Sequence, residues 1–228
     1  MPGPDPRITV IVPAREEEAT IGSVVQQARH YAGEVVVVDG QSRDHTAERA
    51  RAALADVVCD DGLGKGAALR IGARRARGEV LVFMDADGSH DPADIPRLAA
   101  PILRGEADLV VGSRMLGGSD ELHGTFDNFI RNTGSCLLAV LVNRRWGTGL
   151  TDIENGFRAV RKEIMLAIAT DARGFLIEQE MVLRCLKVGY RVAEVASHEY
   201  ERAAGQSKLP TRQGWRFLWH FTKEMLIR

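Results

Sequence analysis

The sequence predicts an α/β protein whose central sheet is mostly parallel and carries helices on both faces. In the first half, β-branched runs alternate with helical stretches, which is typical of repeated β-α units joined by right-handed crossovers. The run EVVVVDG at 34–40 is apolar without a break, as in a strand that is covered on both sides. The 228 residues are within reach of one such unit, so we expect a single domain over residues 1–228.

The first half supplies most of the expected sheet. A helix is expected where Ile21, Val24, Val25 and Ala28 recur on one face, and another follows a glycine-rich entry at 62–66. In chain order we expect strands at 7–14, 34–40, 56–60, 79–87 and 107–114 and helices at 19–32, 43–54, 64–76 and 92–103.

The second half is less regular. We expect a long helix at 124–146, a turn into a strand at 152–160, and an amphipathic helix at 177–189 that Gly189 closes. A strand at 190–200 and an amphipathic helix at about 213–227 complete the chain.

Composition excludes several classes of protein. The net charge of -1 gives no global field that would favour nucleic acid. The three cysteines are far apart, which indicates a reducing compartment and neither a zinc site nor a disulfide framework. The N-terminus lacks a signal-peptide pattern, and the longest strongly apolar run, 136–142, is far shorter than a membrane span. We therefore expect a cytoplasmic protein.

Polar, acidic or glycine-rich residues follow the expected strands and should meet in one crevice, because ligands of parallel sheets bind beyond the carboxyl ends of the strands. The turn after the first strand, PAREEEA, has no glycine, so a dinucleotide site is not expected. GLGKG at 62–66 lacks the spacing of a P-loop, although its N–H groups and Lys65 can still meet an anion.

The sequence DAD at 85–87 ends the apolar run VLVFM. If the segment is extended, Asp85 and Asp87 point the same way and can face one ligand together. Such a pair suits Mg²⁺ or Mn²⁺, which binds few protein carboxylates and several phosphate or water oxygens. We interpret Asp91, just before Pro92, as a helix N-cap.

Two further acids point to a nucleotide. Asp39 ends the second strand and can accept hydrogen bonds from a base or a ribose hydroxyl, and Glu17 follows the first strand. Alternatively, residues 16–18 only favour a helix N-terminus. Together with the DAD sequence, they predict a nucleoside diphosphate site.

These motifs resemble a known family. VIVPAREEE, VVVVDGQSRDHT, GLGKGAALRIG, FMDADGSHDP and VVGSRM are similar to the family 2 glycosyltransferases of the GT-A fold. TDIENGFRAV, EQEMVLRCLKVGYRVAEV and ERAAGQSKL resemble the branch that makes polyprenyl-phosphate (dolichol-phosphate) mannose or glucose. The resemblance covers about residues 7–210 and implies an inverting transfer of a hexose from a GDP- or UDP-sugar to a polyprenyl phosphate.

The resemblance also implies site residues. The donor would be bound by Pro13, Ala14, Glu17, Asp39, Gly64, Lys65, Asp85, Ala86, Asp87 and Lys208. The metal, Mg²⁺ or Mn²⁺, would be held by Asp85 and Asp87, and the acceptor phosphate by Arg114, Arg131 and Ser135. The residues expected to act in catalysis are Asp87, Arg114, Arg131 and Arg202.

Three positions depart from the family pattern. Glu16 stands where asparagine is usual, Ser89 where glutamine often completes the metal site, and DIENGFR where the family has D-x-T-S-G-F-R. Glu154 and Asn155 therefore change the charge near the sugar or the acceptor. These departures leave the sugar and the acceptor open.

The nature of the acceptor decides the chemistry. A phosphate monoester is already anionic near pH 7 and needs positioning by arginines, whereas a sugar hydroxyl needs a general base. Asp152, Glu178 or Glu180 could be that base, but Glu178 and Glu180 do not face the same way on a helix. The alternative is thus the same donor with a soluble hydroxyl acceptor, such as a secondary metabolite or phosphoglycerate.

Two other classes fit less well. A sugar nucleotidyltransferase would need a G-x-G-x-R-type loop after the first strand, and a non-catalytic nucleotide-binding module leaves the acidic pair without a use. The terminal helix mixes aromatic and basic residues. It is expected either to lie at a lipid interface on the inner face of the membrane or to pack on protein, including a second copy in a homodimer.

Overall fold

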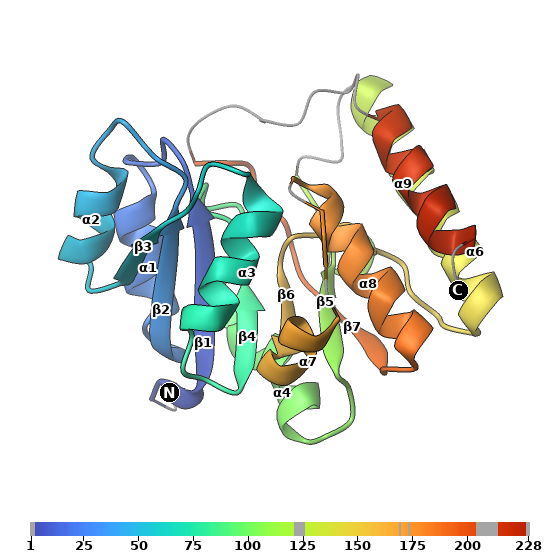
Figure 1. Cartoon of the computed structure of the whole chain (residues 1–228), viewed down its shortest axis with the longest axis horizontal. Coiled ribbons are helices and arrows are strands. Elements are labelled where there is room, and N and C mark those ends of the chain that lie inside the picture. Colours follow the sequence, from blue (N-terminus) through green and yellow to red (C-terminus); the bar gives the residue numbers. More distant parts are fainter. Residues whose placement is uncertain (1–2, 121–125, 169, 173, 204–213, 227–228) are drawn as a thin grey trace.

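The computed structural model describes residues 3–120, 126–168, 170–172, 174–203 and 214–226. Its centre is a seven-stranded sheet (Figure 1). The strands lie in the order β3 (Asp56–Cys59), β2 (Ala32–Asp39), β1 (Asp5–Ala14), β4 (Val80–Phe83), β6 (Arg158–Arg161), β5 (Leu109–Ser113) and β7 (Val192–Ala196).

The sheet is mostly parallel, which confirms the predicted fold class. β6 is the exception, because it pairs antiparallel with both β4 and β5. The other described strands therefore share one direction, and their carboxyl ends meet at one edge of the sheet. The register places Ala14 of β1 beside Asp39 of β2, so the first two strands end level.

Helices cover both faces. α1 (Ile21–Ala28), α2 (Thr46–Ala52) and α4 (Ile95–Leu103) pack on one face through one apolar cluster. α3 (Lys65–Arg75), α7 (Lys162–Ala167) and α8 (Leu176–Val188) pack on the other, together with α6 (Phe126–Trp146) and α9 (Gly214–Leu226). Figure 1 shows α3 and α8 in front of the sheet. Successive residues of β1 belong to opposite clusters, as the period of two in a strand requires.

Several expected boundaries were wrong. α1 ends at Ala28 and β4 ends at Phe83, and β7 is shorter at both ends than the predicted 190–200. Two short helices were missed, α5 (Arg114–Gly117) and α7, and the helix expected at 92–103 begins with a separate 3-10 turn, η1 (Pro92–Asp94), before α4. Asp91 does cap η1, since its side chain accepts from Ala93 N at 2.9 Å, so that interpretation is confirmed.

Polar contacts join α9 to α8. Lys187 Nζ of α8 lies 2.6 Å from Glu224 Oε2 of α9. Arg184 Nη2, which lies 2.7 Å from Glu180 Oε1 within α8, is 3.8 Å from Glu224 Oε1. His220 Nε2 is 4.0 Å from the same Glu180 oxygen. Burial lowers the pKa of His220, although Glu180 and Glu224 oppose this, so the neutral ring is favoured between the helices. Carboxylates and cations here already neutralise each other.

Candidate active site

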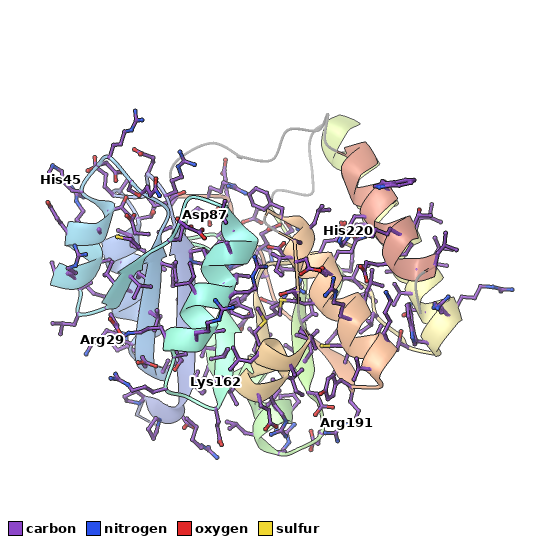
Figure 2. The ribbon with its side chains drawn as sticks, in the orientation of Figure 1. Arg29, His45, Asp87, Lys162, Arg191 and His220 are labelled. Atoms are coloured by element: carbon purple, nitrogen blue, oxygen red, sulfur yellow. The ribbon has the colours of Figure 1, made fainter. Side chains whose placement is uncertain are left out.

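The residues predicted to line a crevice lie at the carboxyl edge of the sheet. Figure 2 shows Asp87 at that upper edge, and Lys162 and Arg191 at the opposite edge. Asp39 ends β2, the DAD sequence follows β4, and Arg114 follows β5. Segments far apart in the sequence thus bring their polar side chains to the same side of the sheet.

The two aspartates lie in a turn after β4, not in the strand. β4 ends at Phe83, and Ala86 and Asp87 belong to a turn. The prediction of a strand to residue 87 was therefore wrong, and strand alternation does not explain where Asp85 and Asp87 point. The turn gives each carboxylate a different cationic partner.

Asp85 is paired with Lys65, the first residue of α3. Lys65 Nζ lies 2.6 Å from Asp85 Oδ1 and 2.8 Å from Glu178 Oε1, which α8 supplies. Burial alone would raise the pKa of Asp85, but Lys65, with His90 and Arg202, lowers it to about 2. Burial also opposes the charge of Lys65, yet the two carboxylates raise the pKa of its ammonium group.

Gly156 makes room for this cluster. A Cβ atom there would lie 2.9 Å from Lys65 Nζ and 3.0 Å from Asp85 Oδ2. Both approaches are closer than ordinary carbon contacts, so a side chain at residue 156 would displace the ion pair. Close packing against Lys65 and Asp85 therefore requires a glycine at residue 156.

Asp87 is held by Ser89 and Arg202. Its Oδ1 accepts from Ser89 Oγ at 2.7 Å and from Ser89 N at 3.1 Å. Its Oδ2 lies 3.1 Å from Arg202 Nη1. Ser89, which stands where a metal-binding glutamine is usual, therefore orients the carboxylate of Asp87.

These carboxylates fit a divalent cation. The cationic partners keep Asp85 and Asp87 ionised, but they also occupy carboxylate oxygens, so a divalent cation would have to displace one of them. Asp87 Oδ2 is the better candidate for a metal ligand, since the long side chain of Arg202 can rotate away, whereas Asp85 is held by Lys65, whose side chain is only 12% exposed. Oxygen ligands are those that Mg²⁺ and Mn²⁺ prefer.

The nucleoside end of the crevice has a buried acceptor. Asp39 is 4% exposed, and its Oδ2 accepts from Ser42 N at 3.3 Å. Its Oδ1 has no hydrogen-bond partner among the described residues. Pro13 and Ala14 lie beside it at the end of β1, and half-buried Glu17 donates its N–H to Thr46 Oγ1. A buried carboxylate oxygen without a partner can accept from a ligand.

Gly64 precedes Lys65 at the start of α3. Its φ of 92° lies in the region that favours glycine, and it lets the chain enter the helix with Lys65 turned towards Asp85. The glycine-rich entry is therefore a backbone requirement at this position.

Arg114 is fixed by carboxylates. Its Nε and Nη2 donate to Asp152 at 2.7 and 3.1 Å, and Nη1 lies 3.6 Å from Glu199. Burial opposes its charge, but Asp152 raises the pKa of the guanidinium group. Burial likewise opposes ionisation of Asp152, and Arg114 lowers the pKa of that carboxyl. Asp152 is thus a partner of Arg114 and a poor general base.

Glu154 lies next to this pair, and its backbone N–H donates to Asp152 Oδ1 at 3.1 Å. Burial raises the pKa of Glu154 most, while a hydrogen bond with Ser135 and the charge of Arg114 oppose the rise. Asp152 and Glu178 raise it further. Ser135 itself is buried on α6. Glu154 therefore connects the Arg114 cluster with α6.

The other candidate bases separate as expected. Glu178 faces Lys65, whereas Glu180 faces Arg184 and accepts from the N–H groups of residues 171 and 172. Only Glu178 lines the crevice, which agrees with the helical argument. Its Oε2 is buried without a partner among the described residues.

The predicted residues Arg131 and Lys208 and the buried Arg158 need separate mention. The structure describes the backbone of Arg131 in α6 but not its side chain, and Lys208 lies outside the described residues. Arg158 is fully buried and donates to the carbonyl groups of Ile153, Asn155 and Glu178. It therefore holds the 153–158 turn against α8.

Sequence reasoning missed two residues of the crevice. His90 accepts a hydrogen bond from the backbone of Asp85, and Glu199 accepts from Ser119 Oγ at 2.6 Å while facing Arg114. His90 could have been suspected from its place in DADGSHDP, but nothing in the spacing links Glu199 to Arg114.

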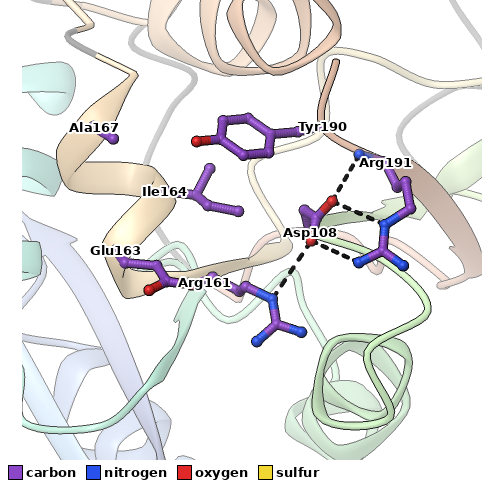
Figure 3. A pocket seen from close by; sticks show the side chains of 7 residues that line it. All are labelled: Asp108, Arg161, Glu163, Ile164, Ala167, Tyr190 and Arg191. Atoms are coloured by element: carbon purple, nitrogen blue, oxygen red, sulfur yellow. Dashed lines mark hydrogen bonds and ion pairs between the residues drawn. The ribbon is translucent and has the colours of Figure 1, made fainter. Parts of the chain in front are cut away.

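A separate hollow lies at the other edge of the sheet. It has a volume of about 440 Å³, and Asp108 lies between Arg161 and Arg191 in it (Figure 3). Arg191 donates to both oxygens of Asp108, and Tyr190 lies beside them. These contacts join β5 to the start of β7, so we assign them to stability.

Comparison with known proteins identifies relatives. The model of glycosyl transferase family 2 matches residues 9–168. The chain is 34% identical to an undecaprenyl-phosphate mannosyltransferase of Micrococcus luteus over 219 residues, covering 89% of this chain and 87% of that protein. It is 33% identical to a polyprenol monophosphomannose synthase of Mycolicibacterium smegmatis over 228 residues, covering 90% and 82%.

Solved structures show the same fold. Glucosyl-3-phosphoglycerate synthase from Mycobacterium tuberculosis, in complex with Mn²⁺, UDP and glucosyl-3-phosphoglycerate, matches with a TM-score of 0.73 and 25% identity. The match covers 97% of this chain and 79% of that one. A complex of the same enzyme with Mg²⁺ and UDP matches with a TM-score of 0.73.

Proposed function

The chain belongs to glycosyl transferase family 2, and from this premise we propose that it transfers a hexose from a nucleoside-diphosphate sugar to a polyprenyl phosphate, with inversion at the anomeric carbon. The observation that carries the proposal is the acidic turn at the carboxyl edge of the sheet, where Asp85 and Asp87 each bind a cationic side chain. The GDP- or UDP-sugar would be bound along the same edge.

The donor would extend from β2 to the DAD turn. Asp39 Oδ1 would accept from the base or the ribose, beside Pro13, Ala14 and Glu17. Gly64 and Lys65 would border the ribose and the diphosphate, with Ala86 packed beneath, and Arg202 and Lys208 would neutralise the phosphates. In the structural relatives, UDP is bound together with Mn²⁺ or Mg²⁺, which supports a nucleotide with a divalent cation here.

We propose that Asp87, with Asp85 behind it, holds Mg²⁺ or Mn²⁺. When bound, such an ion neutralises the charge that develops on the leaving diphosphate. Ser89 keeps Asp87 in one orientation, and Lys65 keeps Asp85 ionised over the working pH range. When the nucleotide sugar binds, the guanidinium group of Arg202 would leave Asp87 and bind the diphosphate instead, since the carboxylate and the diphosphate both present oxygens to it.

The acceptor would be a phosphate monoester, which supplies its own negative charge for attack. Arg114, Arg131 and Ser135 would bind it. Arg114 is already held by Asp152 and Glu199, so it needs little reorganisation to orient an anion. Asp152 and Glu178 are engaged with cations, which agrees with a nucleophile that needs no deprotonation.

Glu154 favours a second candidate. Its raised pKa and its place beside Ser135 and Arg114 suit a general base for a hydroxyl acceptor. Glu154→Gln separates the two. With a phosphate acceptor, the substitution removes a nearby negative charge and should lower the acceptor KM. With a hydroxyl acceptor, it should lower kcat about a hundredfold or more.

A lipid acceptor would bring the protein to a membrane surface, and we propose a peripheral contact at its cytoplasmic face. No helix in the described ranges is long and apolar enough to cross a bilayer. Leu137, Val140 and Leu141 lie at spacings of three and four on α6 and are 57%, 59% and 39% exposed, and Trp219 of α9 is 68% exposed. Such residues suit a lipid interface. A homodimer stays a prediction.

The test is a product assay. Purified protein with Mg²⁺ or Mn²⁺ is incubated with GDP-mannose or UDP-glucose, and with either a short-chain polyprenyl phosphate or 3-phosphoglycerate. We expect a glycosyl phosphoprenol with inverted anomeric configuration. Consumption of the donor only with the hydroxyl acceptor would favour the second candidate, and no consumption with any pair would reject both.

A further inference from the structure

His90 lies where three segments of the crevice meet. It is 5% exposed, and its ring stacks on Phe157 with centroids 4.8 Å apart and an interplanar angle of 13°. Its backbone forms an isolated antiparallel bridge with Glu199. The ring is thus held between the DAD turn, the ENGFR turn and the segment after β7.

The ring completes the hydrogen bonding at the end of β4. Met84 N still donates to Ile11 O of β1, at 3.1 Å. The next N–H, that of Asp85, leaves the sheet and donates to His90 Nδ1 at 3.2 Å. A buried N–H needs an acceptor, and here an imidazole nitrogen takes the place of the neighbouring strand. Because Nδ1 accepts, the ring carries its proton on Nε2 when it is neutral.

The same turn sets both contacts. Phe157 stacks on the His90 ring, and its neighbour Gly156 lies against Asp85 Oδ2 and Lys65 Nζ. The backbone and the carboxylate of Asp85 are therefore fixed from one side by consecutive residues. From the other side, Tyr200 N donates to Ser89 O at 2.8 Å and Ala203 N to Asp87 O at 3.1 Å.

We infer that His90 is a positioning residue for the donor site: its Nδ1 fixes the backbone of Asp85 and thereby the DAD turn that meets the metal and the diphosphate. The inference rests on the proposed function. Without His90 Nδ1 as hydrogen-bond acceptor, the Asp85 N–H must find another partner. The turn then spends part of its time in arrangements that cannot bind the nucleotide sugar. The apparent affinity falls by the fraction of molecules that remain competent.

Two substitutions separate hydrogen bonding from stacking. His90→Asn keeps an acceptor, because Asn Oδ1 lies where His Nδ1 lies, but removes the ring that stacks on Phe157. His90→Phe keeps a ring against Phe157 but has no acceptor. His30→Phe is the matched control, because His30 is exposed at the end of α1 and remote from the crevice.

The readout is the affinity for Mn²⁺ with GDP or UDP, measured by calorimetry on the folded variants, with melting temperature recorded alongside. We expect His90→Phe to weaken nucleotide binding about tenfold and His90→Asn to stay within about threefold of the wild type. His30→Phe should bind as the wild type does. If His90 had only a structural role, its variants would melt at lower temperatures, but His90→Phe would not bind the nucleotide more weakly than His90→Asn.

The outcomes are distinguishable. If the wild type binds neither GDP nor UDP with Mn²⁺, the proposed function fails. If the wild type binds but His90→Phe binds equally well, or His90→Asn binds no better than His90→Phe, the inference about His90 is wrong while the proposed function stands.

Discussion

Replacing Lys65 by methionine should expose how strongly the crevice depends on one buried cation. Lys65→Met keeps most of the side-chain volume but leaves Asp85 and Glu178 facing each other without the ammonium group that lies 2.6 and 2.8 Å from them. Removing one partner from a buried ion pair costs about 3–5 kcal/mol. The Asp85 side chain is 30% exposed and can be hydrated in part, so we expect the lower end, about 3 kcal/mol.

That loss corresponds to a fall of about 6–12 °C in melting temperature for a chain of this size. The sign of the pH dependence follows from the shifts. In the wild type, the lowered pKa of Asp85 contributes stability above the ordinary value of 3.8, and this is lost only as the pH falls towards about 2. In Lys65→Met, burial without the cation raises the pKa of the Asp85 carboxyl. The deficit of the variant should therefore be largest near pH 7.5 and shrink towards pH 4.5.

Urea unfolding of both proteins at pH 7.5 and 4.5 measures this directly. Lys162→Met is a matched control, because Lys162 donates to the carbonyl of Ala76 and faces no carboxylate in the contacts described above. It should cost about 1 kcal/mol at both pH values. A deficit below about 1 kcal/mol for Lys65→Met at pH 7.5, or one that grows on acidification, would refute the reasoning.

Three other predictions follow from the same contacts. Asp87→Asn should keep the melting temperature within a few degrees and lower turnover about a thousandfold, because the cation loses a charged ligand. Unchanged turnover in a product assay would show that Asp87 is not part of the site. Arg202→Gln should free Asp87 Oδ2, so Mn²⁺ alone should bind about tenfold more tightly while turnover falls. Electron paramagnetic resonance measures the Mn²⁺ affinity, and weaker or equal binding would contradict the competition between Arg202 and the ion. The lowered pKa of His220 means that docking of α9 is fully stabilised above the ordinary value of 6.5 and weakens as the pH falls below it. The protection factors of the α9 amides, which correct hydrogen exchange for its intrinsic pH dependence, should therefore be lower at pH 5.5 than at 7.5 in the wild type but not in His220→Phe. An equal change of the protection factors in both proteins would exclude this role.

Much of the fold could be predicted because the amino-acid composition of the strands identifies them. Buried parallel strands such as β2 and β4 are continuous apolar runs, and α1 carries its apolar residues on one face. The ends were less accurate. Asp85 was expected in the strand because the apolar pattern cannot show where β4 stops pairing with its neighbouring strands, which is at Phe83. The antiparallel direction of β6 was also missed, since direction depends on how the chain returns to the sheet.

The candidate site was predictable where its chemistry is local in sequence. The DAD pair and Asp39 were found from carboxylates at strand ends. The partners of these groups were not, because Lys65, Arg202 and His90 reach them from segments whose approach only the fold determines. Arg114 was expected to bind the acceptor phosphate, but its bidentate contact with Asp152, 38 residues away, was not predicted.

The most direct test of the central claim is the position of Mn²⁺ in crystals grown with GDP or UDP, from its anomalous scattering. The account predicts a peak within coordination distance of Asp87 and of both phosphates, with Arg202 displaced from Asp87. A nucleotide bound along β2 and the DAD turn without an ion at Asp87, or an ion at another place in the molecule, would contradict it.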